Sequence, residues 1–330
     1  MRAPRRIPLA HLPTPLQPLD RLSAELGGPR IWVKRDDLSE SGAGGNKVRK
    51  LEFVIAEALH QGADTLVTCG GLQSNHCRAT ALLGAKLGLA VELVLRGEPA
   101  SVPDGNLFLD HLAGAAVHTY PARQYQTELS ALLDAHATAL RARGKRPFLI
   151  PTGASDGLGV WGYLAASEEL ASDFRAVGIR PRHLVVATGS GGTQAGLTAG
   201  LHLHAPQCAV HGVAVCDDAA WFRQKVRSDL LDWRSRSGST LDLDGLRIST
   251  LDRYVGPGYG VADAATLATI RRVVRTEGLL LDPVYTGKAF NGLLQEVTAG
   301  RLCDSDDIVF VHTGGLFGLF PSREQLLAQG

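Results

Sequence analysis

Short apolar runs rich in β-branched residues alternate with longer segments of helical pattern along most of the chain. Segments such as 74–88, 159–174 and 264–278 read as helices, and several of the helical segments open with Ser, Asn or Asp and close on Gly, as capped helices do. The nearly continuous apolar character of the short runs is typical of strands buried on both faces. The alternation predicts an α/β fold with a mostly parallel, doubly wound arrangement. The expected strands lie at 64–70, 90–97, 115–120, 147–153, 183–189, 209–215 and 307–315.

One polar region interrupts this rhythm. Residues 228–249 are rich in Ser and Asp and form the least regular part of the sequence. We expect them to make an excursion on the protein surface.

Length and charge narrow the class of protein. The 330 residues are enough for roughly two domains of about 150 residues each. Because 34 Lys and Arg residues face 33 Asp and Glu residues, the formal net charge is +1 and no global field attracts nucleic acid or a membrane surface. No stretch approaches the about 20 apolar residues of a membrane-spanning helix. We therefore expect neither nucleic acid nor membrane as a partner.

The five cysteines point to a reducing compartment. Their number is odd, and none has the C-x-x-C or C-x-x-H spacing of a zinc site. The pattern indicates neither a disulfide framework nor a metal site, and it fits the cytoplasm best.

Four glycine-rich loops follow expected strands, at 69–76, 151–157, 187–196 and 312–318. Ligands of open parallel sheets bind beyond the carboxyl ends of strands, where these loops lie. The loop ATGSGGTQAG places small residues and free backbone N–H groups at a helix N-terminus, which favours an anion. Gln194 stands where the dinucleotide fingerprint needs glycine, and the P-loop lysine is missing. A single phosphate is the favoured ligand, although tight helix-on-strand packing explains any one such loop equally well.

The second of these loops supports a rival function. Residues 153–157, GASDG, match the G-x-S-x-G nucleophile elbow, and Asp282 and His312 follow in the order of an α/β-hydrolase. A serine hydrolase using Ser155 is thus an alternative. It lacks an HGGG-type oxyanion motif, and it leaves the cationic stretch at 44–52 and the loop at 71–76 unexplained. Turn-forming residues produce the same string for conformational reasons alone.

Three cations, Lys47, Arg49 and Lys50, crowd behind the glycines of GGNKVRK. A solvated first helical turn is the ordinary interpretation of such a cluster. If the loop at 189–193 binds a phosphate and a lysine faces the same cavity, however, a phosphorylated aldehyde held by an imine is the economical hypothesis. Pyridoxal 5'-phosphate needs this lysine, a phosphate cup, and partners for its ring oxygen and ring nitrogen.

Six motifs occur in order over nearly the whole chain: IWVKRDDL, GGNKVRKLE, GGLQSNHCRAT, GSGGTQAGL, LDPVYTGKA and HTGG. They resemble the fold-type II pyridoxal phosphate enzymes of the 1-aminocyclopropane-1-carboxylate (ACC) deaminase and D-cysteine desulfhydrase family. The resemblance implies a tryptophan synthase β-like α/β fold of two open, twisted, mostly parallel sheets flanked by helices. It also implies a large cofactor-binding domain of residues 1–48 and 159–330, a small domain of residues 49–158, a small amino-acid substrate and a homodimer.

The resemblance assigns roles residue by residue. Lys47 is implied as the Schiff-base lysine, with Gly44 and Gly45 turning the backbone and Asn46 capping the helix. Asn75 is implied to contact the ring oxygen of the cofactor, and Ser74, with Asn75 and His76, the substrate. Tyr285 is expected beside the cofactor ring and Tyr259 near the substrate. Further cofactor contacts are implied for Gly189, Ser190, Gly191, Gly192, Thr193, Thr286 and Thr313, whereas Arg49 and Lys50 are expected to have only surface or ion-pair roles.

Two threonines favour one activity within the family. ACC deaminases typically carry Glu and Leu where this chain has Thr286 and Thr313. A carboxylate beside the ring nitrogen favours the protonated ring, which is the stronger electron sink, whereas a hydroxyl tolerates a neutral ring. Opening a cyclopropane is more demanding than expelling a thiolate, so D-cysteine desulfhydrase is preferred over ACC deaminase.

Lys47, Ser74 and Tyr285 are the expected acid–base groups, and Asp217 and Trp221 are the first candidates for substrate specificity. A helix cap at Asp217 and a packed aromatic at Trp221 are equally good interpretations of these two. L-Cysteate sulfo-lyase is a further alternative and would need an additional cation in the pocket. A non-catalytic protein that retains the cofactor site also fits the motifs.

Overall fold

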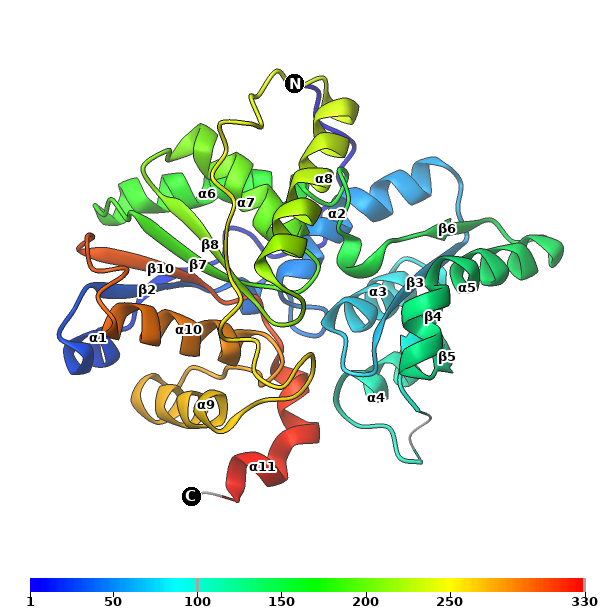
Figure 1. The fold of residues 1–330 in the computed structure, drawn as a ribbon. Helices are drawn as coiled ribbons and strands as arrows, with labels where there is room; N and C mark the ends of the chain where they lie inside the picture. The colour runs from blue at the N-terminus through cyan, green and yellow to red at the C-terminus, as the bar shows by residue number, and fades with distance from the viewer. Residues whose placement is uncertain (99–100, 329–330) are drawn as a thin grey trace.

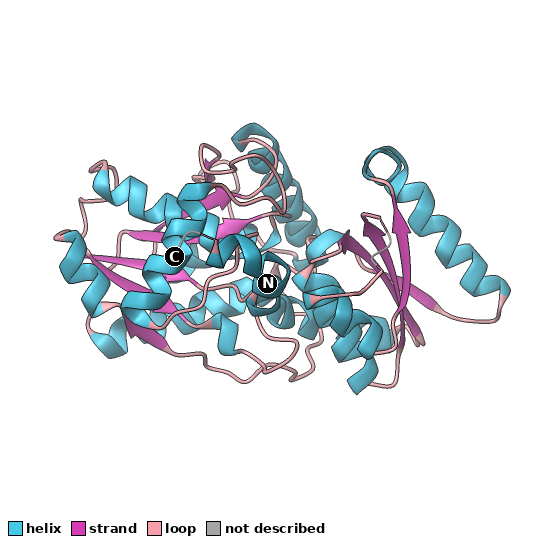
Figure 2. Cartoon of the chain, turned by 90° about the horizontal axis from the view of Figure 1, so that it is seen from below, coloured by secondary structure: helices cyan, strands magenta, loops and turns pink. Residues whose placement is uncertain are grey.

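Two separate β-sheets organise the chain, with helices on their faces (Figures 1 and 2). The computed structural model describes residues 1–98 and 101–328. None of the helices in these two ranges combines the length and apolar character needed to cross a membrane. The predicted α/β class with mostly parallel sheets is confirmed.

The larger sheet has the strand order β1-β2-β10-β7-β8-β9. Only the pair β1–β2 is antiparallel, and the remaining pairs are parallel. The sequence pattern missed β1 and β9, which are three residues long, and β2, which lies inside one of the quoted motifs. The strands are β1 Leu16–Pro18, β2 Arg30–Lys34, β7 His183–Thr188, β8 Ala209–Ala214, β9 Ser249–Leu251 and β10 Asp307–Val311.

The smaller sheet is fully parallel and has the order β5-β4-β3-β6. Its central strand β3 is buried over its whole length, as its continuous apolar character predicts. All seven expected strands are present in the two sheets. The segments expected at 147–153 and 307–315 end earlier, because their last residues turn into the loops that follow. The strands are β3 Thr65–Gly71, β4 Ala90–Arg96, β5 Ala116–Tyr120 and β6 Pro147–Leu149.

Strand β10 shows how the larger sheet is covered on both faces. Ile308 and Phe310 pack against helices α1 (Asp20–Leu26), α9 (Ala264–Glu277) and α10 (Thr286–Thr298). Val309 and Val311 point to the opposite face, because successive side chains of a strand alternate. There they pack against α6 (Trp161–Val177) and α7 (Gly192–His204).

Helix α2, residues Asn46–His60, lies between the two sheets (Figure 1). Val48 and Ile55 belong to a core cluster that also contains Trp161 and Trp233, so apolar packing continues from one lobe into the other. The remaining elements are α3 Asn75–Lys86, α4 Gly105–Leu112, α5 Ala122–Ala142, α8 Ala219–Ser237, α11 Arg323–Leu327, and the short 3-10 helices η1 Asp36–Leu38, η2 Thr152–Ala154 and η3 Leu316–Ser322.

Two local expectations were wrong. The region 228–249 is not simply a surface excursion, because helix α8 extends through Ser237 and buries Trp233 completely. Asn46 does not cap α2. Gly45 occupies the cap position without a side-chain bond, and the Asn46 side chain instead donates a hydrogen bond to Thr193 Oγ1 at 2.9 Å.

Candidate active site

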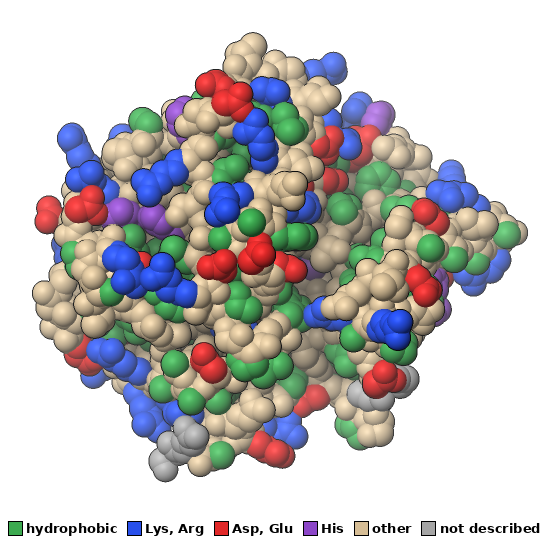
Figure 3. Space-filling view, in the orientation of Figure 1, with side chains coloured by type: hydrophobic (Ala, Val, Ile, Leu, Met, Phe, Trp, Pro, Cys, Tyr) green, Lys and Arg blue, Asp and Glu red, His purple; other side chains and the backbone are tan. Residues whose placement is uncertain are grey.

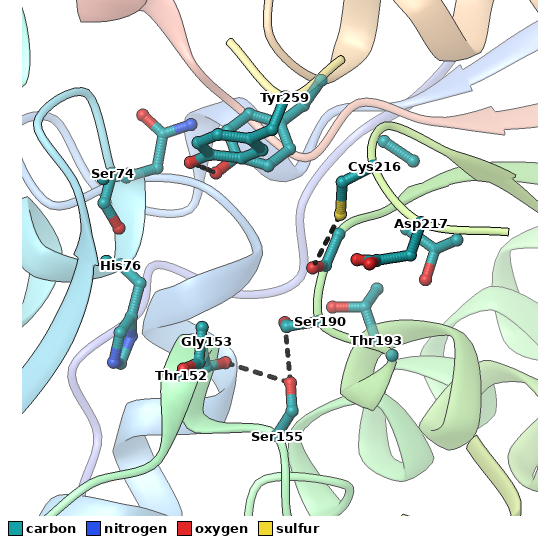
Figure 4. Close-up of a pocket in the computed structure, with 18 of the residues that line it drawn as sticks. Ser74, His76, Thr152, Gly153, Ser155, Ser190, Thr193, Cys216, Asp217 and Tyr259 are labelled. Carbon is teal, nitrogen blue, oxygen red and sulfur yellow. Dashed lines mark hydrogen bonds between the residues drawn. The ribbon is translucent and has the colours of Figure 1, made fainter. Parts of the chain in front are cut away.

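A cavity of about 630 Å³ lies between the lobes, where strands β3, β7 and β8 end and helices α2, α3 and α7 begin (Figure 4). This is the position at which open parallel sheets bind ligands. Most of the residues that the motifs singled out line it: Lys47, Ser74, Asn75, His76, Gly189, Ser190, Gly191, Thr193, Tyr259, Tyr285 and Thr313.

Lys47 lies in the first turn of α2, directly after a loop that requires glycine. Gly45 has a φ of 115°, and a Cβ there would meet the carbonyl oxygen of Thr313 at 2.5 Å. The Lys47 Nζ lies 3.4 Å from the carbonyl oxygen of Gly153. Burial lowers the pKa of Lys47 to about 8, against a smaller opposing effect of Cys77. About a tenth of the amine is then unprotonated at pH 7, which is the form that attacks a carbonyl.

Lys50 is fully buried one turn further along α2, which corrects the expectation of a surface or ion-pair role. Its Nζ donates to the Gly153 carbonyl oxygen at 2.6 Å and to Ser155 Oγ at 2.9 Å. Burial and the charge of Lys47 lower the pKa of Lys50. A Cβ on Gly192 would come within 2.6 Å of the Lys50 Nζ, so this lysine lies directly against the glycine-rich loop. The spacing of three residues from Lys47 is the sequence signal that both share one helix face.

Arg49 has the ion-pair role expected of it, but in the interior. Its side chain is 2% exposed and bonds the Asp36 carboxylate at 2.8 Å and the Glu169 carboxylate at 2.9 Å. Tyr163 adds a hydrogen bond to Asp36 at 2.5 Å. Because Asp36 follows β2 and Glu169 lies on α6, this network fixes the start of α2 to the larger sheet.

The loop between β7 and α7 lies at the cavity, where the anion cradle is expected. Gly191 occupies the cap position of α7 with a φ of 87°, and the N–H groups in the first turn of a helix have no partner within the helix, which favours an anion. Ser190 Oγ accepts a hydrogen bond from Ser155 Oγ at 2.8 Å. The hydroxyl of Thr188 is buried and lacks a partner among the described residues. Gly192 is not part of the cavity wall, and its N–H donates to Ser155 Oγ at 3.2 Å.

The hydrolase triad is not assembled. Ser155 Oγ contacts Lys50, Ser190 and Gly192, and no described histidine reaches it. The ring of His312 bonds the Leu280 carbonyl oxygen and the Gly314 N–H. Asp282 instead accepts from the backbone N–H groups of Val284 and Tyr285 just before α10 and of Thr286 at its first position. The serine hydrolase alternative is therefore wrong.

The last three residues of the QSNH motif, 74–76, form a further part of the cavity wall. Ser74 caps α3 by accepting from the Cys77 N–H at 3.2 Å. Asn75 Oδ1 accepts from Arg78 at 2.8 Å and from Asn106 at 3.2 Å, which leaves the Asn75 amide nitrogen as the donor toward the cavity. The sequence motifs assigned no role to Arg78. Its position three residues after Asn75 in the same helix indicates that the two side chains can meet on one face of that helix.

His76 is neutral and presents a lone pair. The Thr68 hydroxyl donates to the Ile150 carbonyl oxygen at 2.9 Å, so it accepts from His76 Nε2, which lies 2.8 Å away. His76 Nδ1 is then an acceptor, and it is buried without a partner among the described residues. Burial, followed by the charges of Lys47 and Lys50, lowers the pKa of His76 well below its usual value.

Tyr259 and Tyr285 both line the cavity and form a hydrogen-bonded pair at its wall. Their hydroxyl oxygens lie 2.6 Å apart, and their rings meet edge to face. Burial raises the pKa of Tyr259 to about 12 and that of Tyr285 well above its usual value. Both phenols thus keep their protons at neutral pH. Since one proton lies between the two oxygens, the other is left to donate elsewhere.

Thr286 and Thr313 differ in placement. Thr313 lines the cavity, and its carbonyl oxygen accepts from the Asn46 N–H at 3.1 Å. Thr286 is fully buried outside the cavity wall, and its hydroxyl donates to Asp282 Oδ1 at 2.7 Å. The structure therefore gives Thr286 a helix-capping contact, with Tyr285 beside it facing the cavity.

Both specificity candidates are at the cavity wall, and Figure 4 shows Asp217 there. Asp217 has a φ of 47°, and the neighbouring Asp218, rather than Asp217, caps α8. Trp221 is 42% exposed, which excludes the packed-aromatic interpretation. Arg96, which no motif singled out, also lines the cavity and lies 4.8 Å over the ring of Tyr259. Among the described residues it pairs with no carboxylate.

Comparisons with known proteins match nearly the whole chain. The family model described as "Pyridoxal-phosphate dependent enzyme" matches residues 7–314. A D-cysteine desulfhydrase of Klebsiella pneumoniae (strain 342) is 41% identical over 332 residues, with 97% of each chain covered. A mitochondrial bifunctional D-cysteine desulfhydrase/ACC deaminase of Arabidopsis thaliana is 40% identical over 96% of this chain and 80% of its own length. A solved "ACC deaminase homologue" superposes with a TM-score of 0.90 at 36% identity, covering 98% of this chain and 96% of that one.

Proposed function

The chain belongs to the pyridoxal-phosphate dependent enzymes, and on this premise we propose that it is a D-cysteine desulfhydrase, which converts D-cysteine and water to pyruvate, hydrogen sulfide and ammonia. One observation carries the proposal. The Lys47 amine, the anion cradle after β7 and the protonated tyrosine pair converge on a single cavity. The relatives named D-cysteine desulfhydrase at 41% identity support the choice of substrate.

The residues present fit pyridoxal phosphate. The cradle offers backbone N–H groups at the start of α7, the unpartnered hydroxyl of Thr188 and the buried cation of Lys50. A Cβ on Gly189 would approach the Tyr285 ring to 3.1 Å, so glycine leaves this wall open. We propose that Lys47 holds the aldehyde carbon, Asn75 the ring oxygen, and Gly189, Ser190, Gly191 and Thr193 the phosphate.

When bound, pyridoxal phosphate supplies an electron sink that stabilises negative charge at the α-carbon of the substrate. Ser74 and the start of α3 favour the substrate carboxylate through the backbone N–H groups and the helix dipole. The Lys47 Nζ then removes the α-proton, because its lowered pKa leaves it a base near neutral pH. The phenolic proton that the tyrosine pair leaves free donates a hydrogen bond to the departing sulfur.

A substrate panel tests this proposal. Purified protein loaded with pyridoxal phosphate is given D-cysteine, L-cysteine, L-cysteate or ACC, and pyruvate, 2-oxobutanoate, sulfide and ammonia are timed. We expect pyruvate and sulfide in equal amounts from D-cysteine, with the largest kcat/KM of the panel. A protein that binds the cofactor but releases no product from any of the four would be a non-catalytic binder, and the proposal would be wrong.

Two observations are the reason for including ACC and L-cysteate in the substrate panel. The Arabidopsis relative carries both activities in its name, which supports ACC as a second substrate. L-Cysteate would need an additional cation, and Arg96 at the cavity wall supplies one. Thr286 argues against ACC as the main substrate, since its hydroxyl is engaged by Asp282 and offers no carboxylate to a ring nitrogen.

We propose the domain division expected from the sequence. The strands of the larger sheet fall within residues 1–48 and 159–330, and those of the smaller sheet within 49–158. Lys47 stands next to the junction. Cross-links between the two parts, followed by cofactor exchange, would test whether they move relative to each other.

We further propose a homodimer in the cytoplasm. Large apolar side chains are exposed on and beside α4 and on η3, which pack against each other, and such patches mark interfaces. These exposed apolar side chains are Val102, Phe108, Leu112, Leu316 and Phe320.

All five cysteines are free thiols, which suits a reducing compartment such as the cytoplasm. Elsewhere, side chains of both charges are mixed over the face in Figure 3. The mass measured by light scattering, with Phe108→Lys as a variant, tests the dimer.

A further inference from the structure

Three side chains that bind metals converge on the smaller sheet, apart from the catalytic cavity. Glu92 on β4, His118 on β5 and His136 on α5 each offer one ligand atom. These three atoms lie within 4.8 Å of one another. None of the three residues lines the cavity, and the proposed function uses none of them.

The fold brings them together from distant positions. The parallel register pairs Glu92 with Ala116 and Val94 with His118, so Glu92 and His118 lie on the same face of the sheet. Helix α5 covers this face through an apolar cluster that includes Tyr125, Leu129 and Leu133. His136 follows Leu133 by three residues and therefore continues the same side of the helix.

The distances suit a tetrahedral ion. Glu92 Oε2 lies 3.0 Å from His136 Nδ1 and 3.8 Å from His118 Nε2. Zinc binds such atoms at about 2.0–2.2 Å, which sets neighbouring ligand atoms about 3.4 Å apart. The two separations from Glu92 bracket this value, and the two histidine nitrogens lie within 4.8 Å of each other, so a small closing of the three side chains brings them to a common ion.

Within the described part of the chain, one of the three ligand atoms has no hydrogen-bond partner, and the other two are partnered with each other. His118 Nε2 is buried and has no hydrogen-bond partner among the described residues, which is costly for a polar atom. The other ring nitrogen of His136, Nε2, lies 2.9 Å from the Tyr120 hydroxyl. Without an ion, His136 Nδ1 donates to Glu92 Oε2 at 3.0 Å; an ion between them would replace this bond, with the Tyr120 hydroxyl accepting the proton at Nε2. An outer partner of this kind orients metal-binding histidines in general.

The surrounding charges are compatible with a cation. Arg143 bonds the other carboxylate oxygen, Glu92 Oε1, at 3.2 Å, and its side chain is 63% exposed. Oε2 thus remains for the ion. Burial, with His136 and Arg143, lowers the pKa of His118 against the opposing effect of Glu92. The neutral imidazole is the form that binds metals.

We propose that Glu92, His118 and His136 bind a divalent transition metal, best matched by Zn²⁺, which ties α5 to β4 and β5. Two imidazoles and one carboxylate select zinc and its neighbours over calcium or magnesium. No short ligand motif announces the site, because its members are 26 (118 − 92) and 18 (136 − 118) residues apart.

The test compares zinc binding by cofactor-loaded wild type and three variants. His118→Gln and His136→Gln each remove one ligand, whereas His204→Gln, at an exposed histidine that ends α7, is the matched control. Calorimetric titration with ZnCl₂ should give one high-affinity ion for wild type and His204→Gln, with a dissociation constant at least tenfold higher in the two ligand variants. Zinc should also raise the melting temperature of wild type and control only.

Diffraction at the zinc absorption edge gives a second readout that does not depend on any variant folding. An anomalous peak between Glu92, His118 and His136 supports the proposal. A peak elsewhere, no binding by wild type, or equal affinity in all four proteins would overturn it.

Discussion

The Lys47 and Lys50 amines share one acceptor, the carbonyl oxygen of Gly153, at 3.4 and 2.6 Å. Two buried ammonium groups at one carbonyl oppose each other's charge, and the charge of Lys47 contributes to the lowered pKa of Lys50. An anion in the adjacent loop would relieve this opposition. With Lys47 as the proposed reactive amine, the pair would couple that amine to the occupancy of the proposed phosphate cup.

Replacing Lys50 should weaken cofactor retention. Lys50→Gln removes a buried cation against the glycine-rich loop, and a hydrogen bond involving a charged group contributes about 1.5–3 kcal/mol. We expect the dissociation constant of pyridoxal phosphate, measured by titrating apoprotein, to rise about 10- to 100-fold. Lys145→Gln, at an exposed position, serves as the control. An unchanged constant in Lys50→Gln would show that this lysine plays no part in the cup.

Removing the Lys47 amine should separate binding from covalent attachment. Lys47→Ala should lose the borohydride-sensitive visible absorption and turnover while keeping its fold by circular dichroism. Lys86→Ala, in the last turn of α3, is the matched control and should retain both. Full activity in Lys47→Ala would refute the assignment of the reactive amine.

The lowered pKa of Lys47, about 8, predicts a specific pH dependence. Only the unprotonated amine attacks the aldehyde, so the rate at which apoprotein regains visible absorption should rise with pH and level off above about 8. Between pH 8 and the usual value of 10.5 the unfolded state holds more protons on this lysine than the folded state. Apoprotein stability should therefore rise with pH across that window. A rate that is flat from pH 6 to 9 would contradict the lowered pKa.

Breaking the tyrosine pair should slow catalysis without releasing the cofactor. Tyr285→Phe and Tyr259→Phe each remove one hydroxyl of the bond at 2.6 Å and one acidic proton. A positioned proton donor contributes about 10²–10⁴-fold, so we expect kcat/KM for D-cysteine to fall by at least about 10²-fold in one of them. Tyr120→Phe, on the smaller sheet outside the cavity wall, should be near wild type. Normal kinetics in both cavity variants would exclude the pair from the reaction.

The buried ion pair of Arg49 should matter for folding more than any surface pair. Arg49→Met leaves the carboxylate of Asp36 buried and uncompensated, which typically costs about 3–5 kcal/mol. The exposed pair Arg272–Glu25 supplies the control, since Arg272→Met should change the free energy of unfolding by about 1 kcal/mol or less. Urea denaturation of the apoproteins measures both. Equal effects would show that the interior network is not a structural anchor.

Sequence patterns predicted what depends on neighbours in the chain. Continuous apolar runs located β3 and β10, and glycine-rich loops after strands located the cavity, because parallel topology places strand ends together. The Asp282 cap on Thr286 was also a local signal, since an acidic residue just before a helix accepts from its first N–H groups.

What the patterns missed depends on distant partners. The amide of Asn46 serves Thr193, 147 residues away, rather than its own helix. The burial of Lys50 requires the loop at Gly153, 103 residues away, to cover it. The convergence of His118 and His136 on Glu92 requires both the strand register and the path of α5. None of these contacts leaves a period or a motif in the sequence.

The glycines around the cavity floor divide the site into a part that is constrained and a part that is free to vary. A Cβ on Gly70 would meet Ser74 at 2.6 Å, and one on Gly71 would meet the ring of Tyr259 at 3.0 Å. The floor therefore accepts almost no substitution. Arg96 and Trp221 stand at the wall without such restraint, whereas the φ of 47° at Asp217 limits which residues can replace it. A descendant or an engineered variant of this enzyme would acquire new substrates by exchanging the side chains at 96 and 221 while inheriting the floor unchanged.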